Sequence, residues 1–133
     1  MLTLAAGCGE SEPIATVSGL VTVGGTPAAN VYLEFQPQGE GARSIAFADE
    51  EGRFDLMVAT GNFRRGAFVG PHEVTILGAE NVDSFKYWEQ PLDESGTPQP
   101  SSKPRPTVEV PQAGMPLQFE VPPGGTSSAD FAL

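Results

Sequence analysis

Two runs of alternating apolar residues meet at an acidic turn in the stretch 44–58. The apolar positions are Ile45 and Phe47 before the turn, then Phe54, Leu56 and Val58 after it. A period of two residues places these side chains on one face of a β-strand. In the turn, Gly52 tolerates positive φ and the carboxylate of Asp49 can accept hydrogen bonds from the backbone just ahead of it. The stretch therefore predicts an antiparallel hairpin with one apolar face, which a second sheet must cover.

The same alternation recurs along most of the chain. Further strands are predicted at 16–23, 31–36, 71–76, 107–110, 117–121 and 129–133. The 16 glycines and 13 prolines of this 133-residue chain disfavour long helices. We therefore expect an all-β domain at residues 14–133, folded as an antiparallel β-sandwich of seven or eight strands. Gly19 lies on the apolar face of the first strand, where a close backbone approach is expected, and residues 60–70 read as an exposed loop with Arg64 and Arg65 at its tip.

The first 13 residues have the character of a signal-peptide remnant followed by a tether. The run Leu4-Ala5-Ala6-Gly7-Cys8 resembles the lipobox of bacterial lipoproteins. In that family a signal peptidase cuts before the cysteine, which then carries the lipid. The resemblance implies lipidation at Cys8 and attachment to the periplasmic or outer surface of the cell envelope. No basic residue precedes the short apolar run, so we expect the signal peptide to start upstream; the alternative is a frayed terminus with an incidental cysteine.

The formal net charge of −10 bears on which partners the chain can take. A surface this acidic repels phosphate backbones, so we expect no nucleic-acid partner. Cys8 is the single cysteine, which excludes an intrachain disulfide. No apolar run reaches the ~18–20 residues of a transmembrane helix. The expected membrane contact is therefore the lipid on Cys8.

The order of short motifs carries a second resemblance. The motifs are V-S-G-L-V-T-V-G-G-T-P at 17–27, V-Y-L-E-F-Q-P at 31–37, A-D-E-E-G-R-F at 48–54, G-P-H-E-V-T-I at 70–76 and D-F-A-L at 130–133. Together they resemble carboxypeptidase-regulatory-like domains, which are transthyretin-like β-sandwiches found in small planctomycete lipoproteins. The resemblance covers most of residues 14–133 except the 80–103 segment, and it implies a non-catalytic domain.

The inventory of reactive side chains gives no catalytic constellation. His72 is the single histidine, and no serine lies in a Gly-x-Ser-x-Gly context. A zinc site normally takes several His or Cys ligands. We therefore expect no catalytic residue, no metal and no cofactor, with His72 on a strand surface.

The acidic turn offers carboxylates for calcium. Asp49, Glu50 and Glu51 are consecutive, and Asp55 lies nearby. The spacing of an EF-hand loop is absent. A turn with its carboxylates in water is therefore the favoured interpretation.

Three aromatic residues, Phe85, Tyr87 and Trp88, stand in the irregular segment 80–103. They are candidates for contact with a protein or a glycan. The favoured alternative is that they fold back and plug an open end of the sandwich. The function predicted from the sequence is that of a non-catalytic envelope lipoprotein, a structural or protein-interaction module. The alternative is a carbohydrate-binding module that uses these three rings.

Overall fold

A computed structural model describes residues 13–85, 88, 92–97, 99 and 104–133 of the chain. Their backbone forms short strands and the 3₁₀ helix η2 (Ala79–Ser84). The strands in chain order are β1 (Ile14–Ala15), β2 (Ser18–Val23), β3 (Thr26–Pro27), β4 (Tyr32–Pro37), β5 (Ser44–Phe47), β6 (Arg53–Asp55), β7 (Met57–Val58), β8 (Ala67–Phe68), β9 (Gly70–Leu77), β10 (Leu117–Val121) and β11 (Phe131–Ala132). Within the described part of the chain, no helix is long and apolar enough to cross a bilayer.

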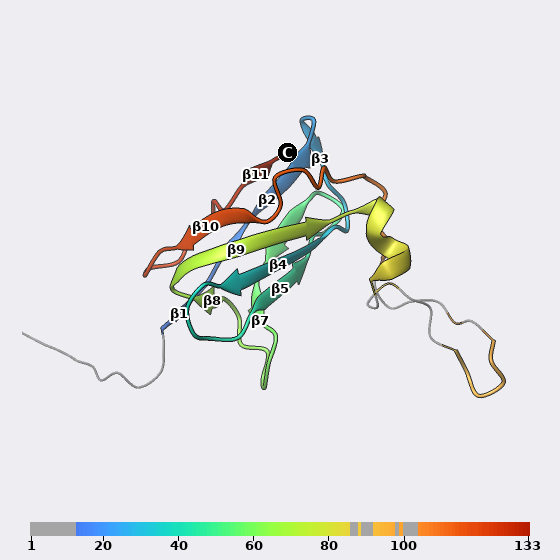
Figure 1. Ribbon diagram of the computed structural model, residues 1–133, viewed down its shortest axis with the longest axis horizontal. Helices are drawn as coiled ribbons and strands as arrows, with labels where there is room; N and C mark the ends of the chain where they lie inside the picture. Colours follow the sequence, from blue (N-terminus) through green and yellow to red (C-terminus); the bar gives the residue numbers. More distant parts are fainter. Residues whose placement is uncertain (1–12, 86–87, 89–91, 98, 100–103) are drawn as a thin grey trace, which may run out of the picture.

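Two packed sheets make up the domain, which confirms the predicted all-β sandwich. The first has the order β10-β9-β4-β5-β7, and all of its neighbours are antiparallel. The second is built around β2, which pairs with β11, β3 and β6; it lies behind the first sheet in Figure 1. The pair β11–β2 is parallel, an exception to the antiparallel prediction. β1 and β8 form a small separate pair.

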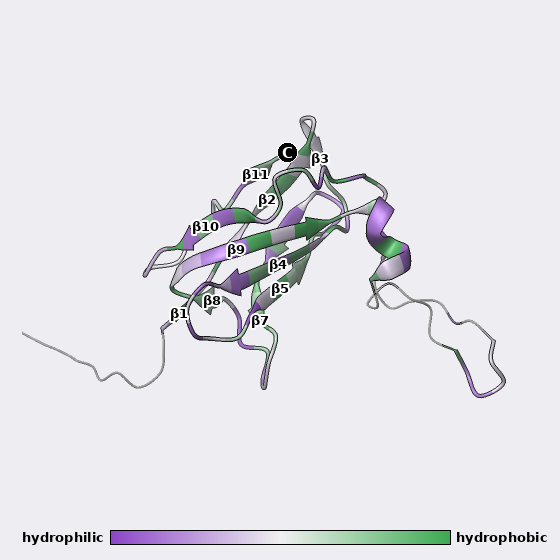
Figure 2. Cartoon of the chain, in the orientation of Figure 1, coloured by the Kyte–Doolittle hydropathy of each residue, from purple (hydrophilic) through white to green (hydrophobic). Residues whose placement is uncertain are grey.

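Apolar side chains between the two sheets form the main core. At its centre Leu33 and Phe35 of β4 and Val74 and Ile76 of β9 are fully buried. Figure 2 shows that the second half of β9 is mainly hydrophobic, whereas its first half is hydrophilic. The phenylalanine rings around Phe35, with centroids 5.7 to 6.3 Å away, are those of Phe54, Phe119 and Phe131. Burial of each such side chain stabilises the fold by about 1.5–3 kcal/mol.

Gly19 has the close contact that the sequence predicts. A Cβ at this position would lie 2.0 Å from the carbonyl oxygen of Ala129, which no side chain allows. The Ala129 N–H donates to the carbonyl of Ser18 at 3.0 Å, so the approach is part of the bonding between neighbouring segments. Asp130 completes this edge, because its Oδ1 accepts the N–H of Leu20 at 3.1 Å.

The predicted hairpin at 44–58, with one apolar face, is wrong in two respects. Ile45 and Phe47 do not face the second sheet, and the strand after the turn is divided between the two sheets. β6 leaves β5 and pairs with β2 in the other sheet, whereas β7 returns to pair with β5. The change of sheet occurs at Leu56, whose N–H donates to the carbonyl of Val17 and whose carbonyl accepts from Gly66. A strand that bends from one sheet into the other closes a corner of the sandwich.

Two other predictions about local structure are also corrected. Residues 107–110 are not a strand, although Val110 is buried. Pro106 and Pro111 flank them, and proline has no N–H for a sheet ladder. In the predicted exposed loop 60–70, Arg64 and Arg65 are exposed, but Ala67 belongs to β8 and is fully buried.

The irregular segment 80–103 contains more local structure than expected. Its first part is η2, where the side chain of Asn81 accepts the N–H of Gly78 at 3.0 Å. Further along, the Asp93 carboxylate accepts from the backbone N–H groups of Thr97 and Ser95 and from the Ser95 hydroxyl. These bonds favour the ionised carboxylate and lower the pKa of Asp93 below its ordinary value.

Candidate functional site

The outer face of the five-stranded sheet carries a second apolar cluster, which we call the outer cluster. Its buried members are Tyr32 of β4, Ile45 of β5 and Trp88. Phe47 and Phe85 pack against them. Successive residues of a strand point to opposite faces, so Tyr32 faces outward while its neighbours fill the main core.

Trp88 is the centre of the outer cluster. Its indole ring has no exposed surface and lies 5.0, 6.0 and 6.3 Å, centroid to centroid, from the rings of Phe85, Phe47 and Tyr32. The contacts with Phe47 and Tyr32 are edge-on, an arrangement that aromatic quadrupoles favour. Among the described residues, the indole Nε1 has no hydrogen-bond acceptor.

The aromatic residues singled out from the sequence thus have different positions. Trp88 folds back, but onto the outer face of the sheet and not into an open end of the sandwich. Phe85 is half-buried beside it, with its ring 4.3 Å from that of Tyr32. In this arrangement Trp88 presents no ring face to a sugar or a protein. Tyr87 lies outside the described residues, as does Cys8, the predicted lipidation site.

His72 is buried, not on the strand surface as predicted. Its position on β9 is in phase with Val74 and Ile76, and its ring lies 6.0 Å from that of Phe35. Nδ1 is 2.9 Å from the carbonyl oxygen of Gly70. A carbonyl only accepts, so Nδ1 carries the proton and Nε2 is left without a partner among the described residues. Burial disfavours the charged imidazolium and lowers the pKa of His72 below its ordinary value of 6.5.

The surroundings of His72 do not resemble a catalytic site. A general base must lie within hydrogen-bond reach of the proton that it abstracts from the substrate. Nδ1 carries a proton directed to the carbonyl of Gly70, and Nε2, which has the lone pair, belongs to a side chain that is only 1% exposed. The geometry makes His72 a polar member of the edge of the main core.

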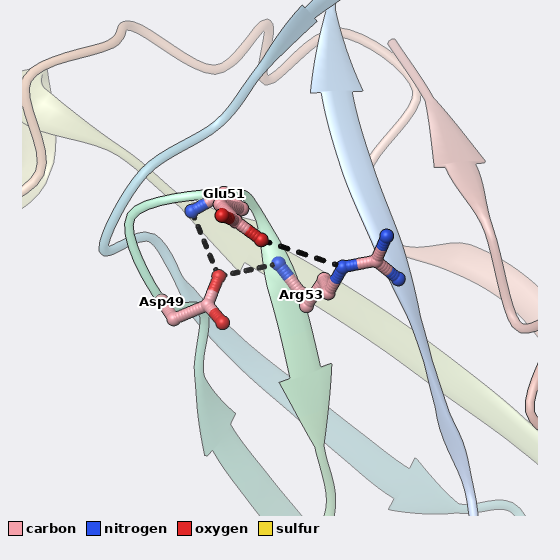
Figure 3. Close-up of polar contacts among 3 residues, drawn as sticks. All are labelled: Asp49, Glu51 and Arg53. Atoms are coloured by element: carbon pink, nitrogen blue, oxygen red, sulfur yellow. Dashed lines mark hydrogen bonds and ion pairs between the residues drawn. The ribbon is translucent and has the colours of Figure 1, made fainter.

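The acidic turn is organised as the sequence predicts. Asp49 Oδ1 accepts the backbone N–H groups of Glu51 at 2.8 Å and Arg53 at 2.9 Å (Figure 3). Gly52 has φ +81°, and the Arg53 guanidinium lies 3.7 Å from the Glu51 carboxylate. One oxygen of Asp49 is therefore committed to closing the turn. Over the described residues, no group of three or more His, Cys, Asp or Glu side chains is placed to hold a metal ion.

Two open grooves meet at Ser18, the first residue of β2. One, of about 240 Å³, is lined in part by Ser18, Arg53 and Asp130. The other, of about 400 Å³, shares Ser18 and continues to Arg65 and the 124–127 turn. Their hydroxyl, guanidinium and carboxylate groups suit hydrogen bonding to a polar surface, and His72 lines neither groove.

Comparison of the chain with protein families, with characterised proteins and with solved structures found no match. The resemblance to carboxypeptidase-regulatory-like domains therefore stays a prediction. Functional inference rests on the residues of this chain alone. Phe63 is exposed and was not singled out from the sequence. The signal was present, because an aromatic residue stands beside Arg64 and Arg65 in a glycine-flanked loop.

Proposed function

We propose that the chain is a non-catalytic lipoprotein of the cell envelope that serves as a structural or protein-interaction module. The observation that carries the proposal is that the fold itself uses the most chemically capable side chains. Trp88 fills the outer cluster, His72 is buried at the edge of the main core, and Asp49 closes a turn. What the domain offers to a partner is a rigid scaffold with loops at its two ends.

The lipid anchor in this proposal rests on the Leu4–Cys8 motif. An acyl chain contributes ~0.8 kcal/mol for each methylene that it buries in a bilayer. Two or three chains on Cys8 would hold an acidic domain at an anionic membrane against the repulsion of its net charge. The location that follows is the periplasmic or outer surface of the envelope.

Mass spectrometry of the natively expressed protein tests the anchor. We expect the N-terminal peptide to begin at Cys8 and to carry a diacylglyceryl group. The protein should partition with membranes, and Cys8→Ser should release it into the soluble fraction. An unmodified Cys8, or a Cys8→Ser variant that stays in the membrane fraction, removes the lipoprotein assignment.

Glycan binding separates the module proposed above from the carbohydrate-binding alternative. That alternative needs Phe85, Tyr87 and Trp88 to present ring faces, so Trp88 would have to leave the outer cluster. Binding to a glycan array that disappears in Trp88→Ala, with an unchanged melting temperature, would favour it. Our proposal expects the reverse, a lowered melting temperature with no glycan-dependent signal.

A further inference from the structure

The loop between β7 and β8, residues 59–66, holds an aromatic side chain in solvent. Phe63 is 53% exposed and has φ +55°, a conformation that is rare for a bulky residue. The loop is closed by backbone bonds, from Phe63 N–H to the carbonyl of Thr60 at 3.0 Å and from Val58 N–H to the carbonyl of Arg64 at 2.7 Å. In Figure 1 this green loop projects beyond the sheets. These backbone hydrogen bonds hold the loop in the conformation that keeps Phe63 exposed.

Three arginines lie in or beside this loop although the chain as a whole is acidic. Arg43, Arg64 and Arg65 are all exposed, and they make up three of the seven basic residues of the chain. The backbone brings them together, because the N–H of Val58 donates to the carbonyl of Arg64 and the N–H of Ala59 to that of Arg43. Arg65 is paired with Asp55, which raises its pKa. For Arg43 and Arg64 the described residues supply no ion-pair partner.

The N-terminal tether joins the domain at this same end. Pro13 accepts the N–H of Val69 at 3.0 Å, and β1 pairs with β8 directly after the loop. A Cβ at Gly66 would lie 2.3 Å from the carbonyl oxygen of Ala15, so loop and tether attachment are in contact. Five residues span at most about 18 Å, so a lipid on Cys8 would hold Pro13 within that distance of the bilayer.

The acidic turn lies away from this end. β5 begins at Ser44, next to β7 and Arg43, and the turn Asp49–Glu51 follows its far end. Glu80 and Asp83 add exposed carboxylates on η2, which Figure 1 places on the side opposite β1 and β8. The loop end also exposes Glu40, Asp55 and Glu120, so it is not basic as a whole. Its positive charge is local to Arg43 and Arg64, which an anionic surface attracts while it repels the acidic turn.

We propose that the 59–66 loop, with Arg43 beside it, is the face that lies against an anionic lipid bilayer; this inference rests on the lipid anchor proposed above. Phe63 enters the headgroup region, where an aromatic ring is stable next to an apolar phase. Arg43 and Arg64 bind lipid phosphates, which the guanidinium matches in geometry. The loop gives the anchored domain a fixed orientation, with the Asp49–Glu51 turn directed away from the bilayer.

Hydrogen exchange on tethered protein tests the orientation. The full chain is coupled through Cys8 to a maleimide lipid in vesicles of phosphatidylcholine with phosphatidylglycerol, or of phosphatidylcholine alone. We expect slower exchange at 59–66 on the anionic vesicles, a smaller effect on the neutral ones, and none at 48–53. Equal exchange of the loop on vesicles and in solution, or equal protection at both ends, would overturn the proposal.

Co-sedimentation of unanchored full-length Cys8→Ser with the same vesicles tests the side chains. Arg43→Gln with Arg64→Gln should lower the partition coefficient about 30-fold, since each arginine near an anionic surface contributes ~1 kcal/mol. Phe63→Asn, which suits positive φ, should lower it several-fold. The matched control, Arg53→Gln with Arg105→Gln, has the same net charge and should bind almost as well as the parent.

Each other outcome is decisive as well. An equal loss in the control pair would mean that only net charge matters and would overturn the assignment of the loop. The loop variants could instead bind vesicles as well as the parent but fail to pull down an envelope protein that the parent captures. That result would overturn the membrane proposal and identify the loop as a protein interface. Because chemical coupling replaces natural lipidation, an unmodified Cys8 in cells would refute the anchor without affecting these vesicle results.

Discussion

The five-stranded sheet buries apolar side chains on both of its faces, but the two faces are covered in different ways. On the inner face, Leu33 and Phe35 meet residues of a second sheet that is itself made of regular strands. On the outer face, Tyr32 and Ile45 are covered by Trp88, which comes from the irregular 80–103 segment. The main core is thus a product of strand pairing, whereas the outer cluster depends on a few aromatic contacts. Substitutions on the inner face should therefore lower the free energy of unfolding more than substitutions on the outer face.

The largest effect is expected from Phe35→Ala in the main core. Removal of a fully buried ring that contacts both sheets should lower the free energy of unfolding by about 3–5 kcal/mol. Urea denaturation followed by circular dichroism measures the loss. A change below 1 kcal/mol would mean that the sheets do not pack through this ring.

Trp88→Ala tests the outer cluster and should have a smaller effect. We expect a loss of about 2–3 kcal/mol, at or below the low end for buried aromatic rings, because water can reach the vacated site. Hydrogen exchange should increase mainly in β5 and at Tyr32, with β9 and β2 still protected. Uniform loss of protection would show that the two faces unfold as one unit, so that the outer cluster is not independent of the main core.

The inner face was largely predictable from the sequence, because the main core follows the period-two rule. β2, β4, β9 and β10 lie close to their predicted positions, and their apolar inward residues follow the period of two. His72 of β9 is the exception, because it was predicted on the surface and is buried. Gly19 and Gly52 were recognisable because a close approach and a positive φ both favour glycine. These features depend on neighbours in sequence or on strand alternation, which a single chain displays.

The outer face was not predictable, and β5 shows why. Ile45 and Phe47 are its large apolar residues, so they were expected to face the second sheet. Instead Ala46 and Ala48 face the main core, where the large rings of β4 and β11 already fill the space, and the large residues turn outward. The choice between faces depends on Trp88, more than forty positions away, which no local pattern connects to β5.

A double-mutant cycle gives the third test of the comparison. Phe47→Leu and Trp88→Leu should couple by about 0.5–1.5 kcal/mol, because their rings are in edge-on contact. Phe35→Leu and Trp88→Leu, on opposite faces, should be additive within about 0.5 kcal/mol. Leucine retains enough volume for the double variants to fold. Coupling of the same size in both cycles would show that the faces are not independent.

The smallest expected effect concerns His72, whose burial had a signal in the sequence. Residues 72, 74 and 76 share one strand face, so the inward position of Val74 implied the same for His72. The prediction of a surface position followed the usual exposure of polar side chains instead of the strand period. Each face thus buries one nitrogen without a partner among the described residues, His72 Nε2 inside and Trp88 Nε1 outside, but only the imidazole titrates.

The pH dependence of unfolding tests His72. Its pKa is lowered in the folded state, so the unfolded chain binds the proton more readily as the pH falls below 6.5. Stability from the neutral imidazole is therefore complete above pH 6.5, declines as the pH falls toward the folded pKa, and changes no further below it. The difference in unfolding free energy between the parent and His72→Leu should shift in favour of the variant over that window, whereas Trp88→Phe should run parallel to the parent. Parallel curves for His72→Leu and the parent would mean that the imidazole is as hydrated in the folded protein as in the unfolded chain, and the edge of the main core would then be open to water at β9.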